Sequence, residues 1–270
     1  LSVAVVTYRT PAAMLARALE SLARAAAEAR AAAGLMQVRV FVIDNSPREA
    51  HEPVMEGLRA WPAEAGPLEL LHGHGNVGYG RANNLVLDRL DSDLHLVINP
   101  DIELAPEALV EALRTLAAHP EAGLLAPAVF GADGARQYLC KRYPSVWVLF
   151  LRGFAPAALR RRGAGAIARY EMRDVIGDHY VDGVPLASGC FMLVRTALFR
   201  EVGGFDPRFF MYFEDYDLSM RISRQARLAY APGVRIVHGG GEAARKGARH
   251  VGWFMASAAR FFSRYGWKFR

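Results

Sequence analysis

Three carboxylates lie close together in the stretch FFMYFEDYDLSMR, residues 209–221. Glu214, Asp215 and Asp217 follow a run of aromatic residues and begin a pattern typical of a helix. A carboxyl group that is partly removed from water has a raised pKa and can serve as a general base. A structural interpretation competes, because acids favour the first turn of a helix and Asp217 has the spacing to pair with Arg221. The stretch alone leaves both interpretations open.

A second polar group follows an apolar segment that ends at residue 98. Asn99 and Asp101 are two positions apart, so their side chains point the same way in an extended chain. A carboxylate there could bind Mg²⁺ or Mn²⁺, whose shells are completed by phosphates and water. Asn-Pro-Asp is equally a common turn sequence. His238 ends another apolar segment, where it could be a further metal ligand or could brace the glycines that follow.

Alternating strands and helices must position these residues. The first half of the chain predicts strands at 1–7, 37–46, 68–73 and 93–101, and helices at 12–32 and within 75–90. This alternation implies a mainly parallel sheet with helices on both faces, and such sheets bind ligands at the carboxyl ends of their strands. Polar residues gather at the predicted strand ends, namely Thr7, Tyr8, Asp44, Asn45, Asn99 and Asp101. We expect these residues to converge at one edge of the sheet.

The second half of the chain has shorter apolar segments. Strands are predicted at 123–130, 188–195 and 227–238, and helices at 196–202 and after Glu214, all extending the same sheet. Residues 140–180 are polar and basic, so we expect loops there rather than a separate core.

Composition limits the class of protein. A length of 270 residues favours one α/β domain with a small appendage. The net charge of +6 favours anionic partners, but the basic stretches carry no nucleic-acid-binding motif, so nucleic acid is not an expected partner. Cys140 and Cys190 lie in unrelated contexts, which argues against a disulfide framework. Two isolated cysteines fit a reducing cytoplasm, and no apolar stretch is long enough to span a bilayer, so we expect a cytoplasmic protein.

Residues 250–269, HVGWFMASAARFFSRYGWKF, place aromatic and apolar side chains at helical intervals with basic residues between them. Such a helix either packs on the main domain or lies at the inner face of a membrane, where basic residues meet anionic headgroups. Together with YPSVWVLFLRGF, residues 143–154, it could receive a lipid-linked acceptor. We expect a main domain over 1–240 and a C-terminal helical segment over 241–270.

The glycine-rich stretch GNVGYGRANN fits neither nucleotide-binding glycine pattern, and the first predicted strand is not followed by a dinucleotide fingerprint. Taken together, however, several motifs resemble glycosyltransferase family 2, and within it the bacterial rhamnosyltransferase-like branch. The resemblance rests on VAVVTYR, VIDNS, GNVGYGRANN, INPDI, SGCFMLVR, GGFDPRFFMYFEDYDLSMR and IVH, from Leu1 to about His238. It implies the GT-A fold, an α/β fold with a mixed, mainly parallel sheet flanked by helices, here followed by a C-terminal amphipathic helix.

The resemblance also implies roles for individual residues. Asp215 would be the general base, and Glu214 would orient the acceptor or cap the helix. Asp101 and His238 would hold a divalent cation, Mg²⁺ or Mn²⁺. Gly189 and Tyr212 would contact the acceptor. The nucleotide sugar would be bound by Thr7, Tyr8, Asp44, Gly78, Arg81, Asn83 and Asn99.

The sequence departs from the family pattern at three places. Asn99 replaces the first Asp of the family's Asp-x-Asp motif, and Arg9 stands where an Asn is usual. GGGEAARK follows His238 in place of the expected polar residues. These departures concern the ribose and metal contacts rather than the family.

The resemblance implies an inverting transferase that moves rhamnose from dTDP-rhamnose to a cell-surface polysaccharide or a lipid-linked glycan, as in cell wall biogenesis. Two alternatives are transfer from a UDP-sugar, galactofuranosyl or another hexosyl, and a catalytically silent protein that binds nucleotide sugars.

Overall fold

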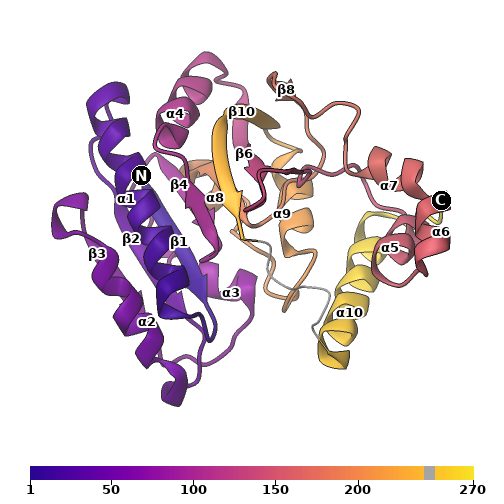
Figure 1. Cartoon of the computed structure of the whole chain (residues 1–270), viewed down its shortest axis with the longest axis horizontal. Helices are drawn as coiled ribbons and strands as arrows, with labels where there is room; N and C mark the ends of the chain where they lie inside the picture. Colours follow the sequence, from indigo (N-terminus) through magenta and orange to yellow (C-terminus); the bar gives the residue numbers. More distant parts are fainter. Residues whose placement is uncertain (240–246) are drawn as a thin grey trace.

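The computed structural model describes residues 1–239 and 247–270 and has one central sheet covered by helices (Figure 1). Within these residues the sheet has ten strands, in the order β3-β2-β1-β4-β9-β6-β10-β5, with β7 beside β6 and β8 beside β10. The strands are β1 (Ser2–Thr7), β2 (Arg39–Asp44), β3 (Leu68–Leu71), β4 (Leu94–Ile98), β5 (Ile102–Leu104), β6 (Ala122–Phe130), β7 (Arg136–Gln137), β8 (Val181–Asp182), β9 (Phe191–Arg195) and β10 (Arg227–His238). The second half of the chain extends the same sheet, as predicted.

The sheet is mixed. Strands β3, β2, β1 and β4 are parallel, and so are β6 and β10. Strand β9 is antiparallel to both of its neighbours, β4 and β6, and joins the two parallel groups. The start of β9 therefore lies at the same edge of the sheet as the end of β4.

Helices cover both faces because the strands are apolar on both sides. Within β1, Val3 and Val5 belong to one core, while Ala4 and Val6 belong to the other. The first core is closed by α1 (Ala12–Ala33) and α4 (Ala108–Ala118), with α2 (Glu52–Gly57) beside α1. The second core is closed by α3 (Tyr79–Asn84), α8 (Thr196–Glu201) and α9 (Glu214–Ile222). Short 3₁₀ helices lie at Arg48–Ala50, Leu58–Ala60, Ala63–Ala65 and Leu87–Arg89.

The expectation of loops over 140–180 is wrong. This segment contains α5 (Val146–Gly153), α6 (Ala157–Arg162) and α7 (Ala164–Tyr170), with Ser145 accepting a hydrogen bond from the Val148 amide at the start of α5. The segment is too basic to form a core alone, but α10 (Ala248–Tyr265) supplies the missing apolar surface. The resulting third core contains Val148, Leu149, Tyr170, Phe209, Phe213, Ala258, Phe261 and Phe262.

Helix α10 confirms the predicted C-terminal helix and packs against the rest of the protein beside α5 (Figure 1). The boundary expected between residues 240 and 241 lies outside the described residues, as does most of the unusual stretch after His238. Within residues 1–239 and 247–270, none of the helices combines the length and apolar character needed to cross a bilayer.

Candidate functional site

The predicted site residues come from the carboxyl ends of β1, β2, β4 and β10, from the start of β9, and from α3, α9 and the turns before these two helices. The register pairs Thr7 with Asp44 across β1 and β2, Ile98 with Phe191 across β4 and β9, and His238 with Ile102 across β10 and β5. All these strand ends meet at one edge of the sheet. A hollow lined by Leu1, Leu35 and Leu94 lies at the opposite edge and contains none of the predicted residues.

Asp44 is the centre of a buried hydrogen-bond group at this edge. Its side chain is fully enclosed, and its oxygens accept bonds from the Thr7 hydroxyl at 2.9 Å and the Ser46 amide at 3.0 Å. His51 Nδ1 lies 2.5 Å from the second oxygen. Burial acts to raise the pKa of Asp44, but the bonds from Ser46, His51 and Thr7 outweigh it and hold the pKa below its ordinary value. A nucleotide base that used Asp44 as an acceptor would have to displace His51.

The glycine-rich loop is tied to the end of β2 by Asn45. The side-chain nitrogen Nδ2 of Asn45 donates to the Gly78 carbonyl at 3.2 Å, and the side-chain oxygen Oδ1 of Asn45 lies 2.9 Å from His74 Nε2. Gly78 has φ of +90°, and a Cβ atom there would lie 2.3 Å from the carbonyl oxygen of Phe210. Only glycine fits this position. The loop is thereby held against the segment that leads into α9.

The remaining predicted nucleotide contacts differ in exposure. Tyr8 is half exposed at the end of β1, where a ligand can reach it. Arg81 is exposed, and its Nε donates to the carbonyl of Pro207 at 2.5 Å. Asn83 is fully buried in α3, with its Nδ2 bonded to the Tyr79 carbonyl and its oxygen unpartnered among the described residues. Asn83 is thus enclosed by protein, whereas Tyr8 and Arg81 lie at the surface.

Asp215 is held in place by backbone amides. Its Oδ2 accepts from the Gly189 amide at 2.9 Å, and its Oδ1 accepts from the Tyr216 amide at 2.8 Å. The Gly189 carbonyl accepts a bond from the Tyr79 hydroxyl at 2.7 Å. A Cβ atom on Gly189 would approach the Cβ of Asp215 to 3.3 Å, so the glycine lets the two segments lie this close. Asp215 is partly exposed, and burial raises its pKa above the ordinary range.

Glu214 is more deeply buried than Asp215. Its Oε2 has no hydrogen-bond partner among the described residues. Burial raises its pKa, and the adjacent Asp215 carboxylate raises it further. A buried, unpartnered carboxyl group is strongly favoured in its neutral form. The pair therefore combines a neutral acid at position 214 with a more accessible base at position 215.

Asp101 and His238 are brought together by the antiparallel pairing of β5 with β10. His238 Nε2 lies 3.4 Å from Asp101 Oδ2, and His238 Nδ1 lies 2.9 Å from Gln137 Oε1. The turn at Asn99 also forms, because the Ile102 amide donates to the Asn99 carbonyl at 3.3 Å. The turn and the proximity of Asp101 to His238 therefore coexist.

Cys190 lies near both the Asp101–His238 pair and the Glu214–Asp215 pair, which is called the acidic pair below. The Asn99 amide donates to the Cys190 carbonyl at 3.0 Å, and Cys190 directly follows Gly189. Burial raises the pKa of the Cys190 thiol to about 12, and the nearby carboxylates of Asp101 and Asp215 act in the same direction. Asp101 and Asp215 thus both lie near this buried thiol.

The turn before α9 is strained. Tyr212 and Phe213 both have positive φ, at 69° and 63°, a conformation that costs energy for large side chains. Tyr212, a predicted acceptor contact, has its hydroxyl 2.9 Å from His250 Nδ1 of α10. This turn directs Glu214 and Asp215 toward Gly80 and Gly189.

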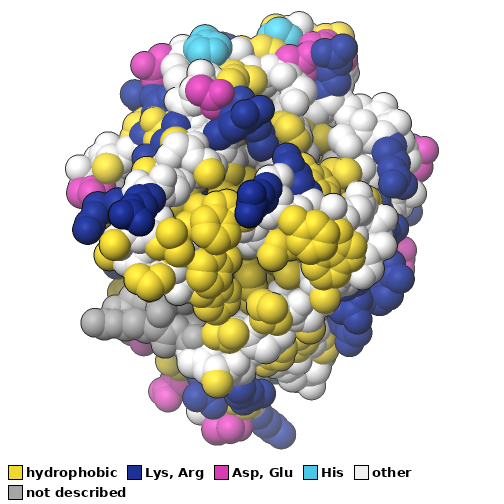
Figure 2. Space-filling view, turned by 90° about the vertical axis from the view of Figure 1, so that its right-hand side faces the viewer, with side chains coloured by type: hydrophobic (Ala, Val, Ile, Leu, Met, Phe, Trp, Pro, Cys, Tyr) yellow, Lys and Arg dark blue, Asp and Glu magenta, His cyan; other side chains and the backbone are white. Residues whose placement is uncertain are grey.

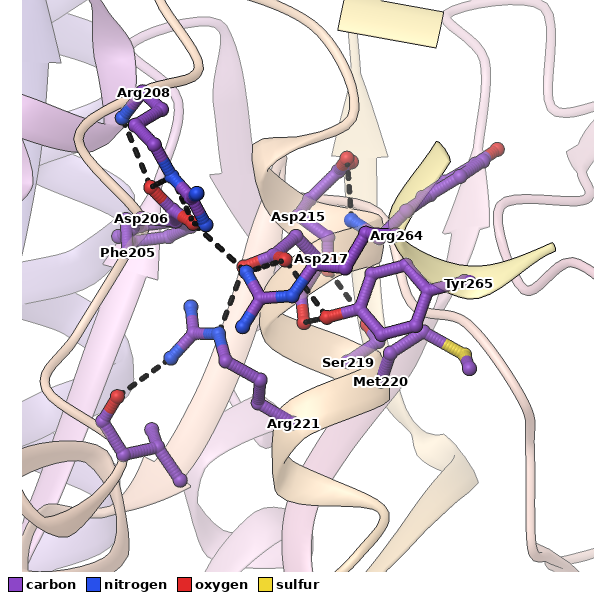
Figure 3. Close-up of polar contacts among 12 residues, drawn as sticks. Phe205, Asp206, Arg208, Asp215, Asp217, Ser219, Met220, Arg221, Arg264 and Tyr265 are labelled. Carbon is purple, nitrogen blue, oxygen red and sulfur yellow. Dashed lines mark hydrogen bonds and ion pairs between the residues drawn. The ribbon is translucent and has the colours of Figure 1, made fainter. Parts of the chain in front are cut away.

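Asp217 has the structural role predicted for it (Figure 3). It is fully buried and accepts from Arg221 Nε at 2.7 Å, from Arg264 at 2.8 Å and from the Tyr265 hydroxyl at 2.8 Å. Arg264 also pairs with Asp206 at 2.8 Å. These bonds fix α10 to α9.

The aromatic run before the carboxylates contributes to the third core. Phe209 and Phe213 are buried there, and Phe213 contacts Phe254 and Phe261 of α10. Both are removed from water because α10 offers them an apolar surface.

Comparison with known proteins decides the family. The model of the family described as "Glycosyl transferase family 2" matches residues 2–203. The chain belongs to glycosyltransferase family 2. The matched residues end before α9, so the family match does not include Asp215 or His238.

Two relatives of this glycosyltransferase family 2 chain are rhamnosyltransferases. An N-acetylglucosaminyl-diphospho-decaprenol L-rhamnosyltransferase of Mycobacterium tuberculosis (strain H37Rv) is 31% identical over 186 residues, which cover 63% of this chain and 58% of the relative. The rhamnosyltransferase WbbL of Escherichia coli (strain K12) is 28% identical over 176 residues, covering 61% of each chain. The match thus spans less than two thirds of these relatives' length.

The fold is GT-A. GalNAc-T7, solved with UDP, GalNAc and Mn²⁺, superposes with a TM-score of 0.61 at 14% identity, covering 88% of this chain and 42% of that one.

Asp101 and His238 have the donor atoms that a divalent cation would need, because a carboxylate oxygen of one faces an imidazole nitrogen of the other. Gln137 accepts from Nδ1 of His238, an arrangement that leaves Nε2 free to act as a ligand. Within residues 1–239 and 247–270, no cluster of three or more His, Cys, Asp or Glu could hold a metal. An ion held here would therefore depend on phosphate oxygens of the donor for further ligands. Of Mg²⁺ and Mn²⁺, the imidazole favours Mn²⁺.

Sequence reasoning missed several residues of this site. His51 was overlooked because it lies in a loose segment after β2, and Gln137 because it lies in a two-residue strand. Tyr79 lies within the glycine-rich motif and His74 directly before it, but the sequence predicts no role for either residue. Their distance in sequence from the residues that they contact left no periodic signal.

Proposed function

We propose that this family 2 chain is an inverting glycosyltransferase that moves a hexose, in the first place rhamnose from dTDP-rhamnose, onto a lipid-linked glycan. The observation that carries the proposal is the position of Asp215, which is fixed by the Gly189 and Tyr216 amides next to Cys190, the residue whose carbonyl binds the turn that leads to Asp101. The names of the two relatives support rhamnose as the sugar, and the mycobacterial relative's name supports a prenyl diphosphate acceptor.

The proposed reaction is a single displacement. Asp215 accepts the proton of the acceptor hydroxyl while that oxygen forms a bond to the anomeric carbon of the donor. The bond from this carbon to the diphosphate breaks on the opposite side, so the configuration inverts and the electron pair leaves with the nucleoside diphosphate. Glu214, neutral and buried, adds no negative charge that would repel the departing diphosphate. Asp101 and His238 would hold a divalent cation, which would stabilise the charge on the leaving diphosphate electrostatically.

The nucleotide end of the donor is proposed to lie over the ends of β1 and β2. Tyr8 is exposed there, and Asp44 lies beneath with His51 covering its second oxygen. Because Asp44 is already bonded within the protein, it would accept the ring N–H shared by thymine and uracil only if His51 moved, and this bond would not discriminate between the two bases. Transfer from a UDP-sugar is the rival within the same fold.

Donor and acceptor panels test the proposal. The chain is incubated with dTDP-rhamnose, UDP-galactofuranose, UDP-glucose or GDP-mannose, with Mn²⁺ or Mg²⁺ and N-acetylglucosaminyl-diphospho-prenol, and release of nucleoside diphosphate is measured. We expect release with dTDP-rhamnose that depends on the acceptor, and a product whose anomeric configuration, read by NMR, is opposite to that of the donor. Release with none of the donors contradicts the transferase proposal, and retention of configuration contradicts the role of Asp215.

A cytoplasmic location, at the inner face of the membrane, also stays a prediction. Two free and buried cysteines are compatible with it.

A further inference from the structure

One face of the protein, built from α5, α10 and the C-terminal residues, exposes large apolar side chains (Figure 2). The figure shows a central apolar cluster with Lys and Arg side chains around it. Its members, called the aromatic face below, are Trp147, Phe150, Phe154, Val251, Met255, Trp267 and Phe269. Phe269 is 67% exposed and Met255 is 56% exposed, so water reaches most of their surface.

Contacts make the aromatic face continuous. The Trp147 amide donates to the Phe269 carbonyl at 3.1 Å, which ties the start of α5 to the C-terminal residues. The rings of Trp147 and Phe150 stack at 5.7 Å, as do those of Trp267 and Phe269 at 6.0 Å. Phe154 packs on Phe254, which brings the end of α5 to α10, where Val251 and Met255 are exposed. A contiguous exposed patch of this kind marks an interaction surface.

The face is firmly supported from beneath. Phe261 and Phe262 are buried in the third core, and Arg264 and Tyr265 are bonded to Asp217 of α9. The aromatic side chains are thus presented by a fixed scaffold, and their exposure is not explained by a loose helix.

Charge identifies the kind of partner. Residues 141–170 and 247–270, which form this side of the protein, contain twelve Lys and Arg and no Asp or Glu. The whole chain has a net charge of +6, so the rest of it is net negative. Glu171 is the acid nearest to the face in sequence; it is buried and pairs with Lys141, Arg152 and Arg173. Neighbouring acids pair with Lys141, Arg142, Arg152 and Arg264, and so offset only part of the positive excess at the aromatic face.

We propose that the aromatic face docks on the surface of a bilayer that contains anionic lipids. Trp and Phe side chains enter the boundary between headgroups and acyl chains, and the surrounding Arg and Lys contact the lipid phosphates. The combination of rigid aromatics with one-sided positive charge fits this partner better than a second copy of the chain, because two such faces would repel each other.

Contacts connect the aromatic face to the acidic pair, Glu214 and Asp215. Tyr170, the last residue of α7, has its hydroxyl 2.5 Å from that of Tyr216, and Tyr216 directly follows Asp215. Arg152 of α5 lies over the Tyr170 ring at 5.4 Å. A bilayer on the aromatic face therefore lies on the same side of the protein as Asp215. The purpose of membrane docking rests on the proposed function, because a lipid-linked acceptor would be held in the same bilayer.

The experiment measures binding to vesicles without donor or acceptor, so that its failure is distinct from failure of the transferase proposal. The chain is sedimented with vesicles of phosphatidylcholine alone or with phosphatidylglycerol added, at low and high salt. We expect binding to the anionic vesicles, weakened by salt, with a blue shift of Trp fluorescence.

The test variant is M255S/W267S/F269S. We expect its affinity for anionic vesicles to fall by at least about tenfold, because three apolar side chains no longer leave water. The matched control is M36S/M55S, which removes exposed apolar side chains on the α1 side of the protein, with Met36 86% exposed. The control should bind like the parent chain, and thermal melting checks that both variants fold.

Three results would overturn the proposal. The first is no sedimentation with anionic vesicles, and the second is equal binding by the test variant and the parent chain. The third is a dimer, seen by light scattering without lipid, that the test variant alone dissociates, since this assigns the face to a second copy. Transfer to a water-soluble acceptor by the test variant should be unchanged.

Discussion

Replacing Asp215 with Asn removes the proposed base with the smallest change of shape. Both carboxylate oxygens accept from backbone amides, those of Gly189 and Tyr216. An Asn side chain has one acceptor oxygen and one donor NH₂ group, so one of the two amides must face a donor. The variant therefore loses both a base and one hydrogen bond.

The two losses have separate magnitudes. Loss of general-base catalysis is expected to lower kcat by about 10²–10⁴-fold, or about 2.7–5.5 kcal/mol in the barrier. An unsatisfied amide costs about 1–3 kcal/mol of stability. At about 2–4 °C per kcal/mol for a chain of this size, the variant should melt a few degrees lower and remain folded at 25 °C.

The assay compares turnover and donor binding in Asp215→Asn with those in Asp88→Asn, an exposed control. We expect kcat to fall while the affinity for the nucleoside diphosphate is unchanged, because the proposed role of Asp215 is to contact the acceptor rather than the nucleotide. For the parent chain, kcat should fall as the pH drops through the raised pKa of Asp215, above the range near 4 that is usual for an Asp. Equal turnover in the two variants would refute the assignment of the base.

Three further predictions concern stability and metal binding. Burial raises the pKa of Glu214, so its contribution to stability is present at acidic pH and is lost as the pH rises through that pKa. Glu214→Gln should therefore match the parent's Tm at pH 5. At pH 9 its Tm should exceed the parent's by about 2–4 °C for each kcal/mol of stability that ionisation of Glu214 costs the parent. Asp217→Ala takes the carboxylate partner from the largely buried Arg221, whereas Arg264 keeps Asp206, and should cost about 3 kcal/mol in denaturant unfolding, against about 0.5 or less for the exposed Asp91→Ala. Gln137→Leu should weaken Mn²⁺ binding, measured by electron paramagnetic resonance with dTDP present, by about 10–100-fold, and His238→Ala by at least as much; unchanged affinity in both contradicts the proposed metal ligands.

The sequence alone predicted the sheet well, because its strands are short apolar runs that end in polar residues. The predicted strand 227–238 coincides with β10, and Gly34 ends α1 in the left-handed conformation. Local chemistry was sufficient in both cases, since an apolar run defines a buried strand and a glycine accepts positive φ.

Features that depend on distant contacts could not be read in this way. Helices α5, α6 and α7 are short, and α5 and α7 share the third core with α10, which comes much later in the chain. The enclosure of Asp44 by His51 and the turn of Phe209 and Phe213 toward α10 are likewise decided by tertiary packing. Asp101 and His238 could be paired only through the family resemblance, because the antiparallel β5–β10 register leaves no local signature.

The pairing of β5 with β10 has a consequence for synthesis of the protein. Asp101 is made well before its partner His238, which ends β10, the last strand among the described residues. Closing so long a loop is entropically costly and comes late in folding. A nascent chain that stops before residue 238 cannot complete the proposed cation pair, so manganese binding at this pair would require that residue 238 has been made.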